Sequence, residues 1–471
     1  MPRLFRCLPL TALMVFSLAM RSEADPLRFE VYATSDQVDS LLGSDSKRAE
    51  VLHRLREFRI SKVYLETVRS GREPDWEELR ATRDFLRRNG IRVAGGIATV
   101  PGPGFGVGST GSAYAMNYEA PETRKALSEI LEKTAAEFDE IIIDDFLMTD
   151  DESELSKSAK GDRSWSEYRL ELLTRIAREC ILAPAKSRNA DVRITIKYPQ
   201  WYDRFHVYGY HVLIGPELFD EVWVGTETRN PDTARFGYTQ PTEGFINYSW
   251  LASIGEDKVK GGWFDTIECE PDHVFMQAVQ SVLAGAKHLT VFNLADIAGD
   301  SPLVGRLKAN LDFLEHLAAL VGDRKPEGLV GYKPPHSDPG IDIYVYDFLC
   351  AMGVPIRMAA SPPESPAAIL LAAQASSDPD IANRIEEWLE GGSVVVFTPG
   401  FALASRSPRM AKTLGYSESW DGTYLEVVPE VIAVSGTSEP NDANVPALDL
   451  PVMRFDAADR AVTLCVGIQD D

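Results

Sequence analysis

The alternation of strand-like and helix-like segments between residues 27 and 321 constrains the fold more than any other feature of the sequence. Eight segments have the apolar, β-branched composition of buried strands, and most are followed by a segment with helix-capping signals. Such an alternation over about 300 residues predicts a (β/α)8 TIM barrel of class α/β. No glycine-rich dinucleotide or phosphate fingerprint follows the first strand, so a doubly wound sheet suits the pattern less well. The strand candidates are residues 28–33, 60–67, 92–99, 140–145, 193–198, 221–226, 260–266 and 288–294.

A second, smaller α/β unit is expected beyond the barrel, which should cover residues 25–321. Residues 322–339 are rich in Gly, Pro and Lys, a composition typical of a linker. Residues 340–414 then have the pattern of a Rossmann-like α/β domain. Residues 415–471 have the pattern of an irregular, β-rich C-terminal segment. Within the second unit, the expected strands are residues 341–346, 368–371 and 393–397, and the expected helix is residues 378–390.

The first 24 residues have the features of an export signal. Arg3 and Arg6 precede an apolar run over residues 8–20, and Ser22-Glu23-Ala24 resembles a small-x-Ala cleavage site. This run is shorter than the roughly 20 apolar residues that a membrane span needs, and no other stretch approaches that length. We therefore expect residues 1–24 to be the signal peptide of a soluble protein exported to the periplasm or the cell exterior.

Charge and motif content exclude several classes of partner and cofactor. The formal net charge is −23, with 48 basic and 71 acidic residues. Nucleic acids and anionic membranes bind basic patches, so we expect neither partner, and a neutral substrate suits the charge better. The five cysteines form no CxxC pair, and no HExxH or GxSxG motif occurs. Asp144, Asp145, Asp150 and Asp151 lack the alternating spacing of a calcium loop, so the sequence predicts no metal and no other cofactor.

Two adjacent carboxylates, Asp144 and Asp145, follow three consecutive isoleucines at the expected carboxyl end of the fourth strand. Chemistry concentrates at this end of parallel barrels. Side chains alternate along a strand, so we expect one carboxylate to face the site and its neighbour to orient another group. Other strand ends should converge on the same pocket. They supply the further candidates Glu66, Lys197, Tyr198, Trp201, Glu227, Arg229, Trp263, Asp265, Glu268 and Asn293.

These residue types suit the binding and cleavage of sugars. Glycoside cleavage needs two carboxyl groups, one that attacks or stabilises the oxocarbenium-like centre and one that protonates the leaving oxygen. We assign the first role to Asp144, with Asp145 beside it, and the second to Glu227. Aromatic rings stack on the apolar faces of sugars. The candidates for that role are Tyr198, Trp201 and Trp263.

Each of these roles has a structural alternative. Arg229 would lower the pKa of the nearby Glu227 carboxyl, which counts against Glu227 as the acid. These two residues can equally form a structural ion pair. Lys197 can pair with Asp144 across neighbouring strands, and Trp263 can belong to the core.

A barrel that ends near residue 321 and is followed by an amidotransferase-like α/β unit resembles the β-galactosidases of glycoside hydrolase family 42. In that family the second domain mediates trimerisation, so the resemblance implies a homo-oligomer formed through residues 340–414. That clan ends strand four with Asn-Glu, whereas this chain has Asp144-Asp145 there. Its strand-seven nucleophile is a Glu, for which Glu268 is a loose match.

The aspartate at the end of strand four is instead similar to the α-galactosidase clan, which implies Asp144 as nucleophile and Glu227 in the acid/base role. That clan uses an Asp on strand six, so the resemblance places the chain among barrel glycosidases without choosing a family. An active amidotransferase would carry a cysteine at the turn after residues 369–371, and Ala372–Ser376 contain none. We therefore expect a structural or oligomerising role for the second unit.

The sequence thus predicts an exported glycoside hydrolase that acts on a neutral oligo- or polysaccharide. The alternative is a non-catalytic carbohydrate-binding barrel. The geometry of the carboxylates should separate the two functions. Two carboxylates roughly 5–10 Å apart across an open pocket favour an enzyme, whereas a single carboxylate locked in ion pairs favours a binding protein.

Overall fold

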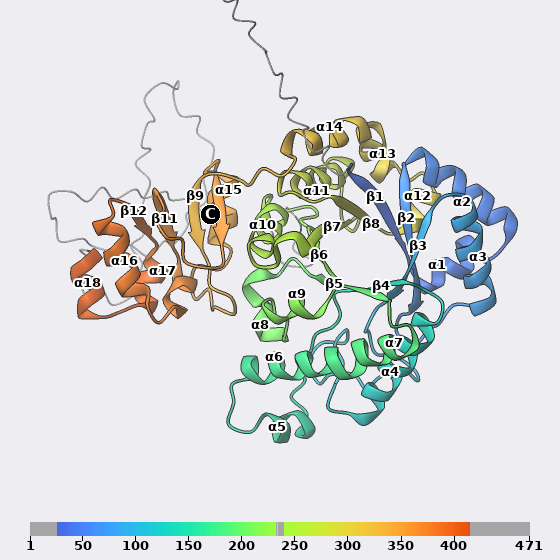
Figure 1. Ribbon diagram of the computed structural model, residues 1–471, viewed down its shortest axis with the longest axis horizontal. Coiled ribbons are helices and arrows are strands. Elements are labelled where there is room, and N and C mark those ends of the chain that lie inside the picture. Colours follow the sequence, from blue (N-terminus) through green and yellow to red (C-terminus); the bar gives the residue numbers. More distant parts are fainter. Residues whose placement is uncertain (1–25, 232, 234–239, 415–471) are drawn as a thin grey trace, which may run out of the picture.

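The expected barrel is present in the computed structural model, which describes residues 26–231, 233 and 240–414. Eight parallel strands close in sequence order into a barrel surrounded by helices (Figure 1). Each strand lies within two residues of its predicted bounds. The strands are β1 (Arg28–Ala33), β2 (Ile60–Val68), β3 (Arg92–Ile97), β4 (Glu140–Ile143), β5 (Arg193–Tyr198), β6 (Glu221–Gly225), β7 (Val259–Asp265) and β8 (His288–Phe292).

Several helices around the barrel begin at capping residues that the sequence offers. Asp75 accepts hydrogen bonds from the backbone N–H groups of residues 77 and 78, and Ser164 forms a capping box with Glu167. The helices are α1 (Ser35–Leu42), α2 (Asp45–Glu57), α3 (Trp76–Arg88), α4 (Pro121–Ala135), α5 (Glu154–Lys160), α6 (Trp165–Ile176), α7 (Ala183–Arg188), α8 (Phe205–Tyr208), α9 (Ile214–Leu218), α10 (Glu243–Gly255), α11 (Pro271–Leu283), α12 (Leu294–Ala298), α13 (Pro302–Ala309) and α14 (Leu311–Val321).

Aromatic side chains fill the interior of the barrel. Tyr32, Trp223 and Trp263 are almost completely buried there. These rings require glycine on nearby strands, because a Cβ at Gly96 would lie 2.6 Å from the Tyr32 ring, and one at Gly261 would lie 2.2 Å from the Trp223 ring. The interior is therefore a packed floor, and chemistry is confined to the loops at the carboxyl ends of the strands.

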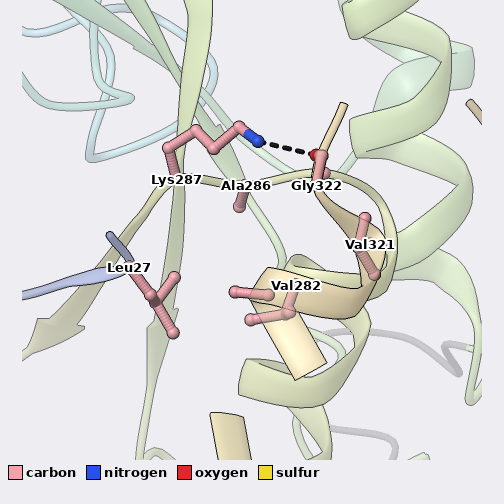
Figure 2. Close-up of a pocket in the computed structure, with 8 residues that line it drawn as sticks. Leu27, Val282, Ala286, Lys287, Val321 and Gly322 are labelled. Atoms are coloured by element: carbon pink, nitrogen blue, oxygen red, sulfur yellow. Dashed lines mark hydrogen bonds between the residues drawn. The ribbon is translucent and has the colours of Figure 1, made fainter. Parts of the chain in front are cut away.

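The amino-terminal end of the barrel is closed by an ion-pair network and by helix ends. Lys62 Nζ lies 2.8 Å from Glu140 Oε2 and 3.8 Å from Glu30 Oε1. Figure 2 shows a small cavity at this end, lined mainly by aliphatic residues such as Leu27 and Val282, where Lys287 Nζ donates a 2.7 Å hydrogen bond to the Gly322 carbonyl. This cavity contains no carboxylate and lies at the end opposite Asp144.

The second unit is a four-stranded parallel sheet in the order β10-β9-β11-β12. The expected linker contains β9, and the segment 341–346, expected as a strand, is a turn that leads into α15. Asp342 explains this difference, because its Oδ2 accepts a 2.7 Å hydrogen bond from the Ala373 N–H. The segment is therefore held by a side-chain hydrogen bond instead of the backbone hydrogen bonds of a β-ladder. The elements are β9 (Leu329–Tyr332), α15 (Val345–Ala351), β10 (Ile356–Ala359), β11 (Ala368–Leu371), α16 (Ile381–Glu390), β12 (Val394–Phe397), α17 (Pro399–Ala404) and α18 (Pro408–Leu414).

The second unit packs against the barrel beside α10 (Figure 1), and buried polar contacts join the two. Asp203, completely buried after β5, accepts a 2.9 Å hydrogen bond from the Tyr344 N–H and lies 3.4 Å from Lys333 Nζ. Trp250 on α10 donates a 2.9 Å hydrogen bond to the Lys333 carbonyl. Because unpaired buried charges are costly, these contacts fix how the two units pack together.

The described residues include no helix that is both long and apolar enough to span a bilayer. Cys180, Cys269 and Cys350 are unpaired thiols, the first two buried. The expected signal peptide and the expected β-rich C-terminal segment lie outside the described residues.

Candidate active site

Asp144 and Asp145 lie directly beyond β4, which ends at Ile143, two residues earlier than expected. The Asp144 N–H still donates a 2.9 Å hydrogen bond to the Ile97 carbonyl, so the backbone follows β3 for one more residue. Asp144 Oδ1 then accepts a 2.9 Å hydrogen bond from the Asp145 N–H. This turn holds both carboxyl groups at the carboxyl end of the barrel, as predicted.

Lys197 connects three carboxyl groups from two strand ends. Its Nζ lies 2.6 Å from Asp145 Oδ2, 2.9 Å from Glu227 Oε1 and 3.5 Å from Asp144 Oδ1. The lysine is 1% exposed and its Nζ is 4.6 Å from the ring centre of Trp263, which forms the floor below it. Any two of these three oxygens are therefore separated by no more than the sum of their distances to Nζ.

Arg69, which the sequence analysis did not select, holds the other side of Asp144. One of its terminal nitrogens lies 2.9 Å from Asp144 Oδ2, and its Nε donates a 2.9 Å hydrogen bond to Glu66 Oε1. Glu66 also accepts hydrogen bonds from the Tyr32 hydroxyl, at 2.8 Å, and from the Ser35 N–H, at 2.7 Å. Glu66 thus holds the guanidinium of Arg69 in position, and Arg69 in turn orients the carboxylate of Asp144.

Arg229 forms its ion pair with Asp265 at the end of β7. The guanidinium contacts both carboxylate oxygens, with Nε 2.9 Å from Oδ1 and a terminal nitrogen 2.6 Å from Oδ2. This bidentate contact fixes the arginine near the site. The cation that contacts Glu227 is Lys197, and the alternative of an Arg229–Glu227 ion pair is replaced by the pair with Asp265. The charge of Arg229 still lowers the pKa of Glu227, as the sequence predicted.

The environments of Asp144 and Glu227 shift their pKa values in opposite directions. Burial raises the pKa of Asp144, but the charges of Lys197 and Arg69 outweigh it and hold the pKa below its usual value. Burial raises the pKa of Glu227 to about 7, although Lys197 lowers it, and the neighbouring Asp145 charge adds to the rise. Glu227 Oε2 is buried and has no hydrogen-bond partner among the described residues. One carboxyl therefore stays ionised while the other can carry a proton near neutral pH.

Several predicted residues lie outside this group. Tyr198 packs outward against Phe205 and donates a 3.1 Å hydrogen bond to the His211 carbonyl. Trp201 is half-buried on the loop after β5, 5.8 Å from the Tyr208 ring. Asn293 caps α12, and Glu268 follows β7 with a left-handed backbone.

Nothing in the described part of the chain groups three or more His, Cys, Asp or Glu side chains in a geometry that could hold a metal ion. Asp150 and Asp151 are instead bonded to the loop between β3 and α4. Asp150 Oδ1 accepts a 2.6 Å hydrogen bond from Ser109, and Asp151 Oδ1 accepts a 3.0 Å hydrogen bond from the Thr110 N–H.

Comparison with known proteins adds a family and several related folds. Residues 17–310 match the family described as "Probable glycosyl hydrolase, catalytic domain". An uncharacterized protein of Saccharolobus solfataricus is 26% identical over 421 residues, which cover 82% of this chain and 68% of that protein.

Two solved structures share the fold at low sequence identity. The exo-β-1,4-mannosidase Op5Man5 from Opitutaceae bacterium strain TAV5 aligns with a TM-score of 0.57 at 12% identity, covering 86% of this chain and 83% of that one. Gan42B, a GH42 β-galactosidase, aligns with a TM-score of 0.57 at 10% identity, covering 81% of this chain and 72% of that one. The resemblance in architecture to family 42 is thus confirmed at the level of the fold.

Proposed function

Because the chain belongs to the family of probable glycosyl hydrolase catalytic domains, we propose that it hydrolyses O-glycosidic bonds in a neutral oligo- or polysaccharide by a two-carboxylate mechanism. The observation that carries this proposal is the cluster in which Lys197 bridges the carboxyl groups that follow β4 and β6. Glycosidases need two neighbouring carboxyl groups whose environments keep one ionised and the other protonated, and Asp144 and Glu227 meet that requirement.

In this mechanism Glu227 donates its proton to the oxygen of the leaving sugar. A pKa of about 7 suits an acid that must hold a proton and release it near neutral pH. The proton would be transferred from Oε2, which has no hydrogen-bond partner among the described residues. After the leaving group departs, the same carboxylate can accept a proton from water.

Asp144 supplies the negative charge at the anomeric centre. Arg69 and Lys197 keep this carboxylate ionised, and its hydrogen bond with the Asp145 N–H fixes its orientation. The oxygens of Asp144 and Glu227 that approach Lys197 lie 3.5 Å and 2.9 Å from its Nζ. Such proximity suits the separation of about 5–5.5 Å in retaining enzymes better than the roughly 6.5–9.5 Å of inverting ones.

The features outside the barrel extend the proposal to location and assembly. The leader-like residues 1–24 support export to the periplasm or the cell exterior. The four-stranded parallel sheet supports an amidotransferase-like second domain with a structural or oligomerising role. The turn after β11 carries no cysteine, which supports a role other than amidotransfer.

A non-catalytic carbohydrate-binding barrel is the competing function, and one observation favours it. The side chains of Asp144 and Glu227 are only 3% and 5% exposed, and both contact Lys197. A protein that retains its carboxylates only as ion-pair partners would have the same contacts.

The test is hydrolysis of a panel of aryl glycosides and plant and microbial glycans by the wild type and by Asp144→Asn. Loss of the charge at the anomeric centre should reduce turnover at least about a hundredfold. Hydrolysis that survives the substitution would contradict the role of Asp144. Binding of a glycan without any cleavage would favour the carbohydrate-binding alternative.

A further inference from the structure

An exposed aromatic side chain lies at the rim of the site, on the loop between β3 and α4. Tyr114 is 61% exposed, and its ring centre is 6.1 Å from that of Phe146. Phe146 directly follows Asp145, and the guanidinium carbon of Arg69 lies 5.3 Å from the centre of its ring. Since Arg69 binds Asp144, the two rings extend outward from the reactive carboxylates.

The loop that carries Tyr114 is held in place by Asp150 and Asp151, which follow β4 in the chain. Ser112 donates a 2.7 Å hydrogen bond from its backbone N–H to Asp150 Oδ2, and the Tyr114 N–H donates a 3.2 Å hydrogen bond to Ser112 Oγ. A Cβ at Gly111 would lie 2.4 Å from Asp150 Oδ2, so glycine is needed for this close approach. The position of Tyr114 is therefore built by dedicated contacts.

The packing of the loop does not account for the aromatic ring. The hydrogen bonds that fix the loop come from backbone groups, serines and aspartates, and most of the Tyr114 side chain faces solvent. The exposed face of the Tyr114 ring, packed on one side near Phe146, is therefore open to another apolar surface. Of the three aromatic residues predicted to stack on sugars, Tyr198 and Trp263 are buried, and Trp201 is half-buried beside the Tyr208 ring.

We propose that Tyr114, backed by Phe146, is a stacking platform for one pyranose ring of a bound oligosaccharide, in the subsite next to the ring that contacts Asp144. The apolar C–H face of a neutral sugar is the surface that matches an exposed aromatic ring. The assignment of a saccharide as the ligand rests on the proposed function. A stacking platform in this neighbouring subsite implies that the substrate has at least two sugar units.

The experiment compares Tyr114→Ala and Tyr114→Phe with the wild type. Val107→Ala is the matched control, because it removes a 41% exposed apolar side chain from the same loop. The probes are cello-, manno-, xylo- and chito-oligosaccharides of two to six units, together with the methyl glycosides of the same sugars. Binding is measured calorimetrically, with Asp144→Asn added to every variant for any probe that is hydrolysed, and hydrolysis is measured separately.

Loss of one covered ring face should weaken oligosaccharide binding about tenfold in Tyr114→Ala. Tyr114→Phe and Val107→Ala should bind within about twofold of the wild type, and methyl glycosides should bind all variants equally. Oligosaccharide hydrolysis and binding that Tyr114→Ala leaves unchanged would overturn the platform while the proposed function stands. A tenfold loss of binding without hydrolysis by the wild type would support the platform and overturn the catalytic proposal. Failure of every probe to bind or react would overturn both.

Discussion

Replacing Lys197 with methionine tests whether this lysine organises the site. The substitution keeps the length of the side chain but removes the cation that contacts Asp144, Asp145 and Glu227. Three buried carboxyl groups then lose a shared positive charge. We expect their pKa values to rise, because burial disfavours their ionised forms and no lysine compensates.

The loss of stability follows from the distances. At an effective dielectric constant of about 20, unit charges about 3 Å apart interact by roughly 5 kcal/mol, and breaking a buried ion pair costs about 3–5 kcal/mol once the desolvation of the lysine is included. In a barrel of about 290 residues this corresponds to a decrease in Tm of about 5–8 °C at pH 8. The Lys197 ammonium, with its pKa raised, is fully charged across the tested range.

The pH dependence of this loss has a definite sign. Glu227 has a folded pKa of about 7, above its unfolded value, so its contribution to stability is present at low pH and is lost as pH rises through 7. In Lys197→Met that pKa is higher, so the variant continues to lose stability between pH 7 and 8. One pH unit corresponds to about 1.4 kcal/mol, so the change at Glu227 should make the destabilisation larger at pH 8 than at pH 5 by up to about that amount.

Thermal unfolding followed by circular dichroism at pH 5 and pH 8 measures both quantities. Lys62→Met is the matched control, since Lys62 is 3% exposed and pairs with Glu140 and Glu30 at the opposite end of the barrel. The control should destabilise the fold without shifting the pH profile of hydrolysis, whereas Lys197→Met should shift that profile to higher pH. A loss below about 1 kcal/mol in Lys197→Met, or an equal loss at both pH values, would refute the reasoning.

Three further measurements follow from the same electrostatics. The wild-type kcat/KM should decline above about pH 7 as Glu227 loses its proton, and a profile that is flat to pH 9 would exclude Glu227 as the acid. Glu30 is buried, but Lys62 and His288 lower its pKa to about 2. Glu30→Gln should therefore lower the free energy of unfolding by about 3 kcal/mol at pH 7. Urea titrations should show this difference between variant and wild type shrinking as pH falls from about 4.5 towards 2. His336 is kept neutral by burial and by nearby His211, with a pKa of about 3. The free energy of unfolding of the wild type should therefore fall by about 2 kcal/mol between pH 6.5 and pH 5, and a His336→Phe variant with the same acid sensitivity would contradict this cause.

Strand periodicity predicted the barrel because buried apolar strands alternate with helices along the chain, several of which have a side-chain cap. The second unit was predicted less well. β9 (Leu329–Tyr332) is four residues long and lies in a stretch rich in Gly and Pro, so its composition resembles a linker. The segment near Asp342 is apolar enough to suggest a strand, but contacts distant in sequence shape it into a turn.

The carboxylates and their partner Lys197 could be predicted from sequence, whereas Arg69 was missed. Asp144 and Glu227 lie where strands end, and the strand count alone brings those ends together. The signal that could have identified Arg69 is its position three residues after Glu66, just beyond the end of β2. Side-chain alternation also indicates that Tyr198 must face away from the site if Lys197 faces into it. The exposure of Tyr114 depends on the folded loop and leaves no periodic signal.

The most direct test of a glycosidase mechanism with Glu227 as its acid is the leaving-group dependence of Glu227→Gln. We would measure its kcat/KM on a cleaved oligosaccharide and on the 2,4-dinitrophenyl glycoside of the same sugar. A dinitrophenolate leaves without a proton, so the variant should lose at least about a hundredfold on the oligosaccharide and less than about tenfold on the activated glycoside. Equal losses on both substrates, or no loss on either, would contradict the account.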